Sequence, residues 1–397
     1  MWQGRRVVLG VTGGIAAYKS VHLARALSVR GATVDVVLSH GATRFIGVAT
    51  FEAVTRRRVV TSLWEPGTAL EHVTLGEQAD LIIVAPATAH LLARAAQGMA
   101  DDLLSATLLA ARAPVLVAPA MNDEMFAQSA TAANLAHLRE RGWHVVGPVV
   151  GPLAEGPADR PGRMSEPEAI LAHAERVLYG EGPLQHAKVL VTAGPTREAI
   201  DPVRVVTNRS SGRMGHALAE AAWRRGAEVT LVTGPTGEPP PHGVTVLRVE
   251  TTSEMAAAVR RHLPSSDVLI MAAAPADYRP VTSRDTKLPR SEGGFTLAFE
   301  ATDDILLGTL AERHPRLTTV GFALETGDAV AKGRAKLRRK QLDMIVVNDA
   351  LEPGAGFEVP TNAVTILDVH GVETRVSLRD KALVAEAILD AIEAYRG

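Results

Sequence analysis

The 397-residue sequence contains no cysteine, so disulfide bonds, thiolate metal ligands and cysteine nucleophiles are excluded. It also lacks an excess of either charge, because 42 lysines and arginines stand against 44 aspartates and glutamates. The resulting net charge of -2 does not favour nucleic acid or an acidic membrane surface as a partner. We therefore expect small molecules as partners, with no nucleic acid and no membrane.

Long apolar runs are missing too, and none reaches the length of a membrane span. The first residues, MWQGRRVVLGV, have neither the long apolar core nor the small-residue cleavage site of a secretion signal. On these grounds we expect a cytoplasmic protein.

Apolar runs typical of β-strands alternate with helical patterns along the whole chain. In the first half the predicted strands cover 5–11, 32–39, 81–87, 114–121 and 143–148, and long helical patterns cover 15–31 and 122–142. In the second half the predicted strands cover 187–194, 227–234, 267–274, 317–323 and 343–349. This alternation predicts the α/β class, with two doubly wound, Rossmann-like domains.

The short polar stretch 179–188 separates the two halves. We place the domain boundary there, giving domains 1–182 and 183–397. A Gly- and Pro-rich segment, 151–164, is too close to the strands of the first domain to be a linker and is interpreted as a functional flap.

The end of the second domain departs from the alternating pattern. Residues 362–378 predict a hairpin that turns near His370 and Gly371. A final helical pattern then runs to Tyr395.

A phosphate site is indicated by residues 189–215, VLVTAGPTREAIDPVRVVTNRSSGRMG. Small residues let the backbone approach an anion, and the helical pattern after Ser210-Ser211-Gly212 offers unpaired N–H groups in its first turn. Charge is supplied by Arg197, Arg204, Arg209 and Arg213. The spacing is neither GxxxxGK[ST] nor GxGxxG, which favours a nucleotide site of a different family, and an ordinary βα turn with surface arginines is the alternative.

Small and hydroxyl residues follow each predicted strand of the first domain. They occupy 12–19, 39–43, 85–88 and 118–122. Ligands of open α/β sheets bind beyond the carboxyl ends of the strands, so these segments predict a cleft that admits a flat ring and a phosphate.

Several long motifs resemble known enzyme families. GGIAAYK, APATAHLLARAAQGMADDLL and PAMNDEMF are similar to the FMN-dependent cysteine decarboxylases. The stretch 189–215, AAAPADYRP, GFALET and AKLRRKQLDMIVVND are similar to phosphopantothenate–cysteine ligases. Fused in this order, over roughly residues 5–395, they resemble the bifunctional bacterial proteins of coenzyme A biosynthesis.

For the first domain, the resemblance implies that FMN oxidises the cysteine of 4′-phosphopantothenoylcysteine, that CO2 is lost, and that the electrons return to give 4′-phosphopantetheine. It implies His72 as the base, whose ordinary pKa suits proton transfer at neutral pH, and Asn122 as the holder of the substrate carboxylate. Met121 and Met125 are of a type that usually packs. The implied FMN contacts are Gly13, Gly14, Ile15, Ala16, Ser39, Thr43, Thr88 and Met121.

The flap departs from the family pattern. The family carries a cysteine there, which protonates the enethiolate during the final reduction, whereas this chain has Glu155 and one extra residue before Pro161-Gly162-Arg163-Met164. A carboxyl group whose pKa is raised by burial could donate the proton. The alternative is that Glu155 is solvated and that water or another group donates.

For the second domain, the resemblance implies activation of a carboxylate by CTP as an acyl-cytidylate, which the cysteine amine then attacks. Asp277 matches the cytosine-reading carboxylate and Phe322 the residue beside the base, while Asn208 and Arg204 match positions on the acyl-cytidylate side. Asp303 and Asp304 are either ligand contacts or a helix start. Further implied nucleotide contacts are Ala272 and Ala273.

Several lysines of this domain are further candidates for contacts with the nucleotide. Lys332, Lys336 and Lys340 form one helical stripe, which is more often a solvated face, but Lys336 and Lys340 match the two triphosphate lysines of the family. Lys287 matches a further nucleotide lysine. The usual KIKK is Lys287-Leu288-Pro289-Arg290 here, so that a family lysine is replaced by Pro289 and Arg290 is a possible substitute.

Triphosphate chemistry implies Mg2+, for which no protein ligand can be named. Similar proteins complete the flavin site at a subunit interface, so we expect a homo-oligomer built on trimers of the flavin domain and dimers of the ligase domain. Two alternatives stay open: a ligase with a catalytically silent FMN-binding regulatory domain, and an NAD(P) oxidoreductase, which the missing glycine fingerprint disfavours.

Overall fold

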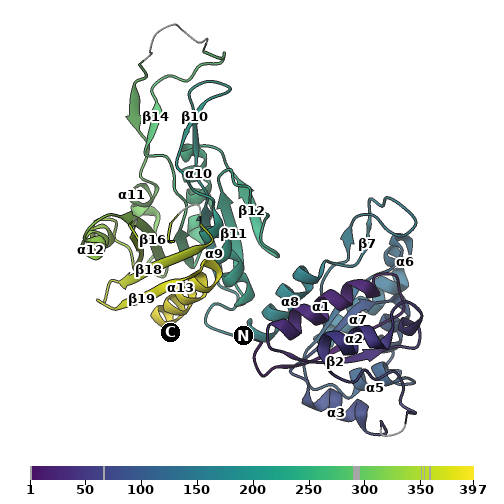
Figure 1. Cartoon of the computed structure of the whole chain (residues 1–397). Coiled ribbons are helices and arrows are strands. Elements are labelled where there is room, and N and C mark those ends of the chain that lie inside the picture. The colour runs from purple at the N-terminus through teal and green to yellow at the C-terminus, as the bar shows by residue number, and fades with distance from the viewer. Residues whose placement is uncertain (1, 66–67, 289–295, 350, 353, 357–358) are drawn as a thin grey trace. The chain divides into compact units, whose positions relative to one another are not determined.

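The computed structural model describes residues 2–65, 68–288, 296–349, 351–352, 354–356 and 359–397. It divides into two compact units, Met1–Leu178 and Tyr179–Gly397, and each is described by itself (Figure 1). None of the helices in the described part of the chain combines the length and the apolar character that crossing a membrane requires.

A parallel five-stranded sheet, in the order β2-β1-β3-β4-β5, forms the centre of the first unit. Its strands are β1 (Arg6–Val11), β2 (Thr33–Leu38), β3 (Leu81–Ala87), β4 (Val115–Pro119) and β5 (His144–Val145). Nearly all residues of β1 to β4 are buried, as expected for a sheet covered on both faces. The strand order reverses direction between β1 and β3, and a ligand is expected at that point.

Helices cover both faces of this sheet. One core cluster includes buried residues of α1 (Ala17–Val29), α2 (Val48–Thr55) and α8 (Pro167–Tyr179). The other includes residues of α3 (Glu71–Gln78), α4 (Ala89–Ala96), α5 (Leu103–Leu109) and α7 (Ser129–Glu140). The predicted doubly wound α/β fold is thereby confirmed for this unit.

The predicted helix over 122–142 is wrong in one respect, because two helices occupy this stretch. α6 (Asp123–Ala127) ends at Ala127, Gln128 is extended with a φ of -64° and a ψ of 138°, and α7 begins at the next residue. The hydroxyl of Thr131 donates to the carbonyl oxygen of Met125, which the break leaves without a helical partner. Apolar spacing alone does not reveal such a break.

The flap forms a ribbon after the last strand of the sheet. β6 (Val149–Val150) pairs antiparallel with β7 (Pro161–Arg163), and Leu153 and Gly156 form a bridge between them. The segment is thus a hairpin attached to the domain at both ends.

The second unit contains an eight-stranded sheet in the order β12-β11-β8-β13-β16-β17-β18-β19. The first six strands are parallel: β12 (Thr245–Arg248), β11 (Glu228–Thr233), β8 (Lys188–Ala193), β13 (Val268–Met271), β16 (Thr318–Glu325) and β17 (Met344–Asp349). This is the Rossmann strand order, with its reversal between β8 and β13. The antiparallel strands β18 (Thr361–Asp368) and β19 (Glu373–Asp380) extend the sheet and form the predicted hairpin.

Five α-helices accompany this sheet in the described residues: α9 (Arg213–Arg224), α10 (Thr252–His262), α11 (Ile305–Gly308), α12 (Ala329–Arg339) and α13 (Lys381–Arg396). α9 packs against α13 and β8. The side chain of Asp380 accepts a hydrogen bond from the N–H of Ala382 and begins α13 there.

Two short ribbons form an arm at one end of the second unit (Figure 1). β9 (Arg197–Ala199) pairs with β10 (Val205–Thr207), and β14 (Tyr278–Pro280) pairs with β15 (Phe299–Ala301). β14 lies beside β9. The arm exposes several apolar side chains: Val203, Val205, Tyr278, Val281 and Phe299.

Candidate active sites

A cavity of about 860 Å³ opens at the carboxyl ends of β1 and β3 in the first unit. It lies at the point where the strand order reverses. Its walls are the segments that follow β1, β2, β3 and β4, closed on one side by the flap.

Thr12 ties the two central strands together at the cavity. Its hydroxyl donates to the carbonyl oxygen of Pro86 at 2.7 Å and accepts from the N–H of Thr88 at 3.1 Å. The next residue, Gly13, admits no side chain, because a Cβ would lie 2.7 Å from the backbone carbon of Gly41. The backbone therefore forms the wall here, which fits a flat ring and a phosphate.

Most of the residues predicted for the flavin site line this cavity. They are Gly13, Gly14, Ile15, Ala16, Ser39, Thr88, Met121, Asn122 and Glu155. Thr43 is not among them; it is exposed, and its hydroxyl donates to the carbonyl oxygen of His40.

His72 is also absent from the lining of this cavity. It belongs to α3, which packs against α5. Its Nδ1 is buried and has no hydrogen-bond partner in the described part of the chain. Leu70, two residues earlier in the chain, is 71% exposed.

The flap carboxylate contacts the residue expected to bind the substrate. The Nδ2 of Asn122 donates a hydrogen bond to the Oε1 of Glu155. The Oδ1 of Asn122 accepts from the N–H of Glu124 at 2.9 Å and so begins α6. Asn122 thus links the start of a helix to the flap inside the cavity.

The sequence interpretation assigned no individual role to three charged residues that line the cavity: Lys19, Arg94 and Asp102. Lys19 is buried, and its ammonium donates to the carbonyl oxygen of Met164 and to Glu166, which fastens the end of the flap. Burial opposes ionisation of Glu166, but Lys19 and Arg163 together outweigh it and keep the pKa of this carboxyl below its usual value. Lys19 lies in the GGIAAYK motif, so its position was a usable signal.

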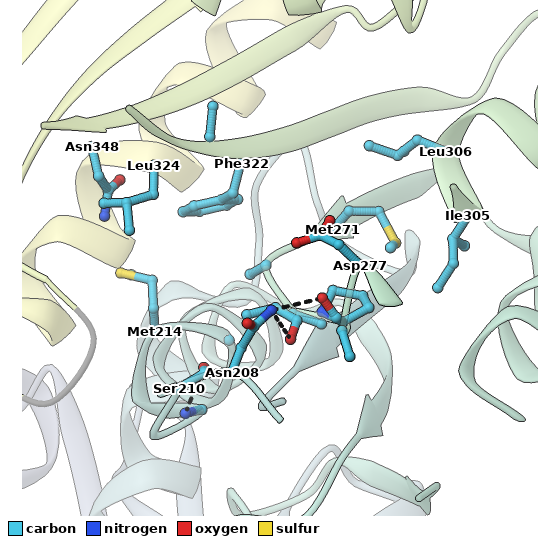
Figure 2. Close-up of a pocket in the computed structure, with 18 of the residues that line it drawn as sticks. Asn208, Ser210, Met214, Met271, Asp277, Ile305, Leu306, Phe322, Leu324 and Asn348 are labelled. Atoms are coloured by element: carbon cyan, nitrogen blue, oxygen red, sulfur yellow. Dashed lines mark hydrogen bonds between the residues drawn. The ribbon is translucent and has the colours of Figure 1, made fainter. Parts of the chain in front are cut away.

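A second cavity, of about 330 Å³, lies at the carboxyl ends of β8, β13 and β16 in the second unit (Figure 2). The hydroxyl of Thr192 accepts from the N–H of Ala273 at 3.1 Å and joins the two central strands, as Thr12 does in the first unit. The first turn of α9 enters this cavity because Gly215 allows the helix to approach β8. A Cβ at Gly215 would lie 2.5 Å from the Cβ of Ala193.

Many residues predicted for the ligase site line this cavity. They are Asn208, Ala272, Ala273, Asp277, Asp303, Asp304, Phe322, Lys336 and Lys340. The Nδ2 of Asn208 donates to the carbonyl oxygens of Ala274 and Pro275 (Figure 2).

The two predicted triphosphate lysines are held in ion pairs. Lys336 pairs with Glu325 at 2.5 Å, and Lys340 pairs with Asp304 at 2.9 Å. Burial opposes ionisation of Asp304, but Lys340 and two backbone N–H groups hold the pKa of this carboxyl below its usual value. Asp304 also begins α11, so it is a helix start as well as a cavity residue. Lys332 is exposed and does not line the cavity.

Arg204 and Lys287 do not line the cavity. Arg204 pairs with the buried Asp201 at 2.5 Å and donates to the carbonyl oxygen of Leu288, and Lys287 is exposed. The positions Pro289 and Arg290 lie outside the described residues. Of the four arginines expected at the phosphate site, Arg213 alone lines this cavity as the structure describes it.

Asn348, Asn362 and Lys381 were not predicted but line the same cavity. Asn348 ends a predicted apolar strand, so the strand-end rule could have found it. Asn362 and Lys381 carried no such signal, because the antiparallel hairpin brings them to this edge of the sheet. No cluster of three or more histidine, aspartate or glutamate side chains that could hold a metal ion occurs within the described ranges.

Known proteins share both halves of this arrangement. The family model "Flavoprotein" matches residues 1–178, and the model "DNA/pantothenate metabolism flavoprotein C-terminal domain" matches residues 184–395. The chain is 46% identical to the coenzyme A biosynthesis bifunctional protein CoaBC of Mycobacterium tuberculosis, over 98% of this chain and 97% of that protein. The chain belongs to the CoaBC family.

Two other members give the same result. The CoaBC protein of Vibrio cholerae is 45% identical over 98% of both chains. That of Bacillus subtilis is 43% identical over 99% of this chain and 98% of that protein. The predicted family and fold are confirmed, and the protein is a bifunctional enzyme of coenzyme A biosynthesis with a flavoprotein half and a ligase half.

Proposed function

We propose that residues 1–182 bind FMN and decarboxylate 4′-phosphopantothenoylcysteine, and that residues 183–397 form this compound from 4′-phosphopantothenate, cysteine and CTP. The observation that carries the proposal is the pair of cavities, one at the strand reversal of each sheet, lined by most of the motif residues. Family membership over the full chain supports it.

In the first half, FMN supplies a two-electron acceptor and donor for the substrate cysteine. Gly13, Gly14 and Thr88 are the proposed wall for the flavin, because a side chain at Gly13 would fill the cradle. The amide of Asn122 binds the substrate carboxylate without the charge of a salt bridge, so the loss of CO2 is not opposed. His72 is proposed to take up the substrate proton.

Glu155 is proposed as the acid that protonates the enethiolate at the final reduction. It replaces the cysteine of related flaps and lies in the cavity against Asn122. In its protonated form a carboxyl group carries the O–H donor that this step needs.

In the second half, the proposed order is formation of the acyl-cytidylate with release of pyrophosphate, then attack by the cysteine amine with release of CMP. Asp277 accepts from the exocyclic amine of cytosine, with Phe322 beside the base. Lys336 and Lys340 stabilise the triphosphate and exchange their carboxylate partners for phosphate. Mg2+ is proposed on the chemistry of the triphosphate.

Both halves are proposed to be completed by further copies of the chain. His72 lies outside the flavin cavity, and Leu70, two residues before it in the chain, is exposed and would be covered by a neighbouring copy. Arg204 and Lys287 lie outside the ligase cavity, near the exposed apolar side chains of the arm. Trimers of the flavin half and dimers of the ligase half would bring these residues to a partner's cavity. We also propose that the protein is located in the cytoplasm.

The test is incubation of the purified protein with phosphopantothenate, cysteine, CTP and Mg2+, with the products followed by mass spectrometry. Appearance of 4′-phosphopantetheine is expected. Accumulation of phosphopantothenoylcysteine by a protein with bound FMN would show a silent flavin half, and no CTP-dependent product would refute the ligase half.

A further inference from the structure

A buried carboxylate in the arm of the second unit has no part in the proposed steps. Asp201 lies in the loop between β9 and β10 and is 1% exposed. A carboxylate is seldom buried in this way unless cations and hydrogen-bond donors compensate the loss of water. The partners of Asp201 therefore show which segments of the arm it holds together.

One oxygen of Asp201 closes the loop in which this residue lies. The Oδ1 accepts from the N–H groups of Val203 at 2.9 Å and Arg204 at 2.8 Å. The N–H of Ile200 donates to the carbonyl oxygen of Arg204 at 2.9 Å. Such bonds from an aspartate to the backbone that follows it are typical of a tight turn, and here they fix the backbone of Arg204.

The other oxygen joins this loop to a segment much later in the chain. The Oδ2 of Asp201 accepts from the Nε of Arg204 at 2.9 Å, from its Nη2 at 2.5 Å, and from the N–H of Leu288 at 3.1 Å. The same Nη2 donates to the carbonyl oxygen of Leu288 at 2.7 Å. Both backbone groups of Leu288 are thus bound, and we call Asp201, Arg204 and Leu288 the carboxylate clip.

The clip determines where the backbone next to Lys287 lies. A second bond between the same segments runs from the N–H of Arg284 to the carbonyl oxygen of Ile200 at 3.1 Å. The strands that precede the two segments, β9 and β14, lie side by side in the arm (Figure 1). Lys287 itself is exposed and forms no part of the clip, but its neighbour Leu288 is held by both of its backbone groups.

The carboxylate of Asp201 stays ionised inside the clip. Burial opposes its ionisation, but the guanidinium of Arg204 and the N–H groups of Leu288, Val203 and Arg204 outweigh burial and hold the pKa of Asp201 well below its usual range. Arg204 therefore has a permanently charged partner. Its contribution to a substrate is a set of directed N–H donors and not an unpaired positive charge.

The clip also fixes the direction in which Arg204 can donate. Asp201 and Leu288 occupy its Nε and Nη2, and its side chain is 36% exposed. A guanidinium is planar, so holding two of its nitrogens sets the position of the third. The N–H groups on Nη1 thus have one orientation relative to the backbone next to Lys287.

We propose that Asp201 is a positioning residue of the ligase reaction, because its clip holds Arg204 and Lys287 at a fixed spacing and so brings both to the bound nucleotide as one unit. Asp201 itself does not touch the substrate. This inference rests on the proposed ligase function, in which both cations act on the nucleotide. Without the clip the two side chains would move independently, and each would lose the benefit of orientation.

The test is a double-mutant cycle in the full-length protein between Asp201→Asn and Lys287→Met. It is measured as kcat/KM of ligation and as the Kd for CTP by titration calorimetry. Asparagine keeps the size of the side chain and one oxygen for the loop, but its amide nitrogen cannot accept from Arg204 or Leu288. The control is Glu300→Gln, which removes the partner of Arg279 at 2.8 Å in the β14–β15 ribbon.

Lysine 287 and its positioning residue are expected to act as one group. Each single variant should lower kcat/KM about 10- to 100-fold, and the control should stay close to wild type. Lys287→Met should add less than about 3-fold to the loss already present in Asp201→Asn. A purely structural role of Asp201 predicts losses that multiply, because Lys287 is not part of the clip. Multiplying losses, or full activity of Lys287→Met, would overturn the inference.

Arg204→Lys is the second variant, because lysine keeps the charge but lacks the fork that binds Asp201 and the carbonyl oxygen of Leu288 together. It should absorb the effect of Lys287→Met in the same way, and it carries the test if Asp201→Asn does not fold.

Calorimetry separates this inference from the proposed function. CTP binding that Lys287→Met weakens in the wild-type background but not in Asp201→Asn supports the clip even if no ligation product forms. Ligation by the wild type, with losses that multiply in the double variant, leaves the ligase function intact and refutes the positioning role of Asp201.

Discussion

The side-chain amide of Asn122 donates to the carboxylate of Glu155 across the flavin cavity. A substrate carboxylate bound by Asn122 would compete for the same amide. Substrate binding would then release Glu155 from its partner and leave its carboxyl group free to face the substrate. In the proposed mechanism, substrate binding and proton donation would be coupled through Asn122.

Glu155→Gln is expected to block the final reduction and spare decarboxylation. The amide cannot donate a carboxyl proton, so the variant should release the oxidised enethiol and make 4′-phosphopantetheine about 10²- to 10⁴-fold more slowly. Mass spectrometry of the products distinguishes the two compounds. Glu168→Gln is the control, because Glu168 is an exposed carboxylate that follows the flap in the sequence. Normal formation of 4′-phosphopantetheine by Glu155→Gln would assign the donor role to water or another group.

His72→Asn is expected to reduce decarboxylation by about 10²- to 10⁴-fold, while ligation and FMN absorbance are retained. Because His72 lies outside the cavity of its own chain, the deficit should be relieved in mixed oligomers. The measurement is decarboxylation after co-expression of His72→Asn with Asn122→Ala. Activity above that of either variant alone is expected, and its absence would argue against a shared site.

Gly215→Ala is expected to destabilise the second unit by about 1–3 kcal/mol, because the added methyl would overlap Ala193 and the carbonyl oxygen of Thr192. Denaturant unfolding followed by tryptophan fluorescence measures the change, and Trp223 contributes the signal of the second unit. Gly237→Ala serves as the control, since a Cβ at Gly237 meets no atom within 4 Å. Equal losses in both variants would indicate a backbone effect common to glycines.

The contribution of Lys381 to stability is expected to grow with pH. Its pKa is about 8 in the folded chain and 10.5 ordinarily, so between these values the unfolded state binds the additional proton. Stability then rises with pH across this window, and the buried charge is most costly below it. The measurement is the free energy of unfolding of wild type minus that of Lys381→Met, from about pH 7 to about pH 10. A difference independent of pH would contradict the lowered pKa.

Local sequence was sufficient for the strands and for the residues that follow them. Buried apolar runs predicted β1, β3, β8 and β13, the carboxyl-end rule then found Gly13 and Thr88, and the family resemblance indicated Ala273. The spacing of apolar residues did not reveal the break at Gln128, because helical spacing continues on both sides of this extended residue. The sequence also left two roles of Asp304 as alternatives, whereas in the structure its carboxylate both begins a helix and pairs with Lys340.

The sequence by itself determined the family, the two α/β folds and the strand-end residues, because strand burial and turn chemistry are properties of neighbouring residues. Only the tertiary structure decided which distant groups meet. The pairing of Asn122 with Glu155, the separation of His72 from the flavin cavity and the position of Lys381 in the ligase cavity each depend on how remote segments pack. Packing sets the solvation and the charge around each group, and these decide its chemistry.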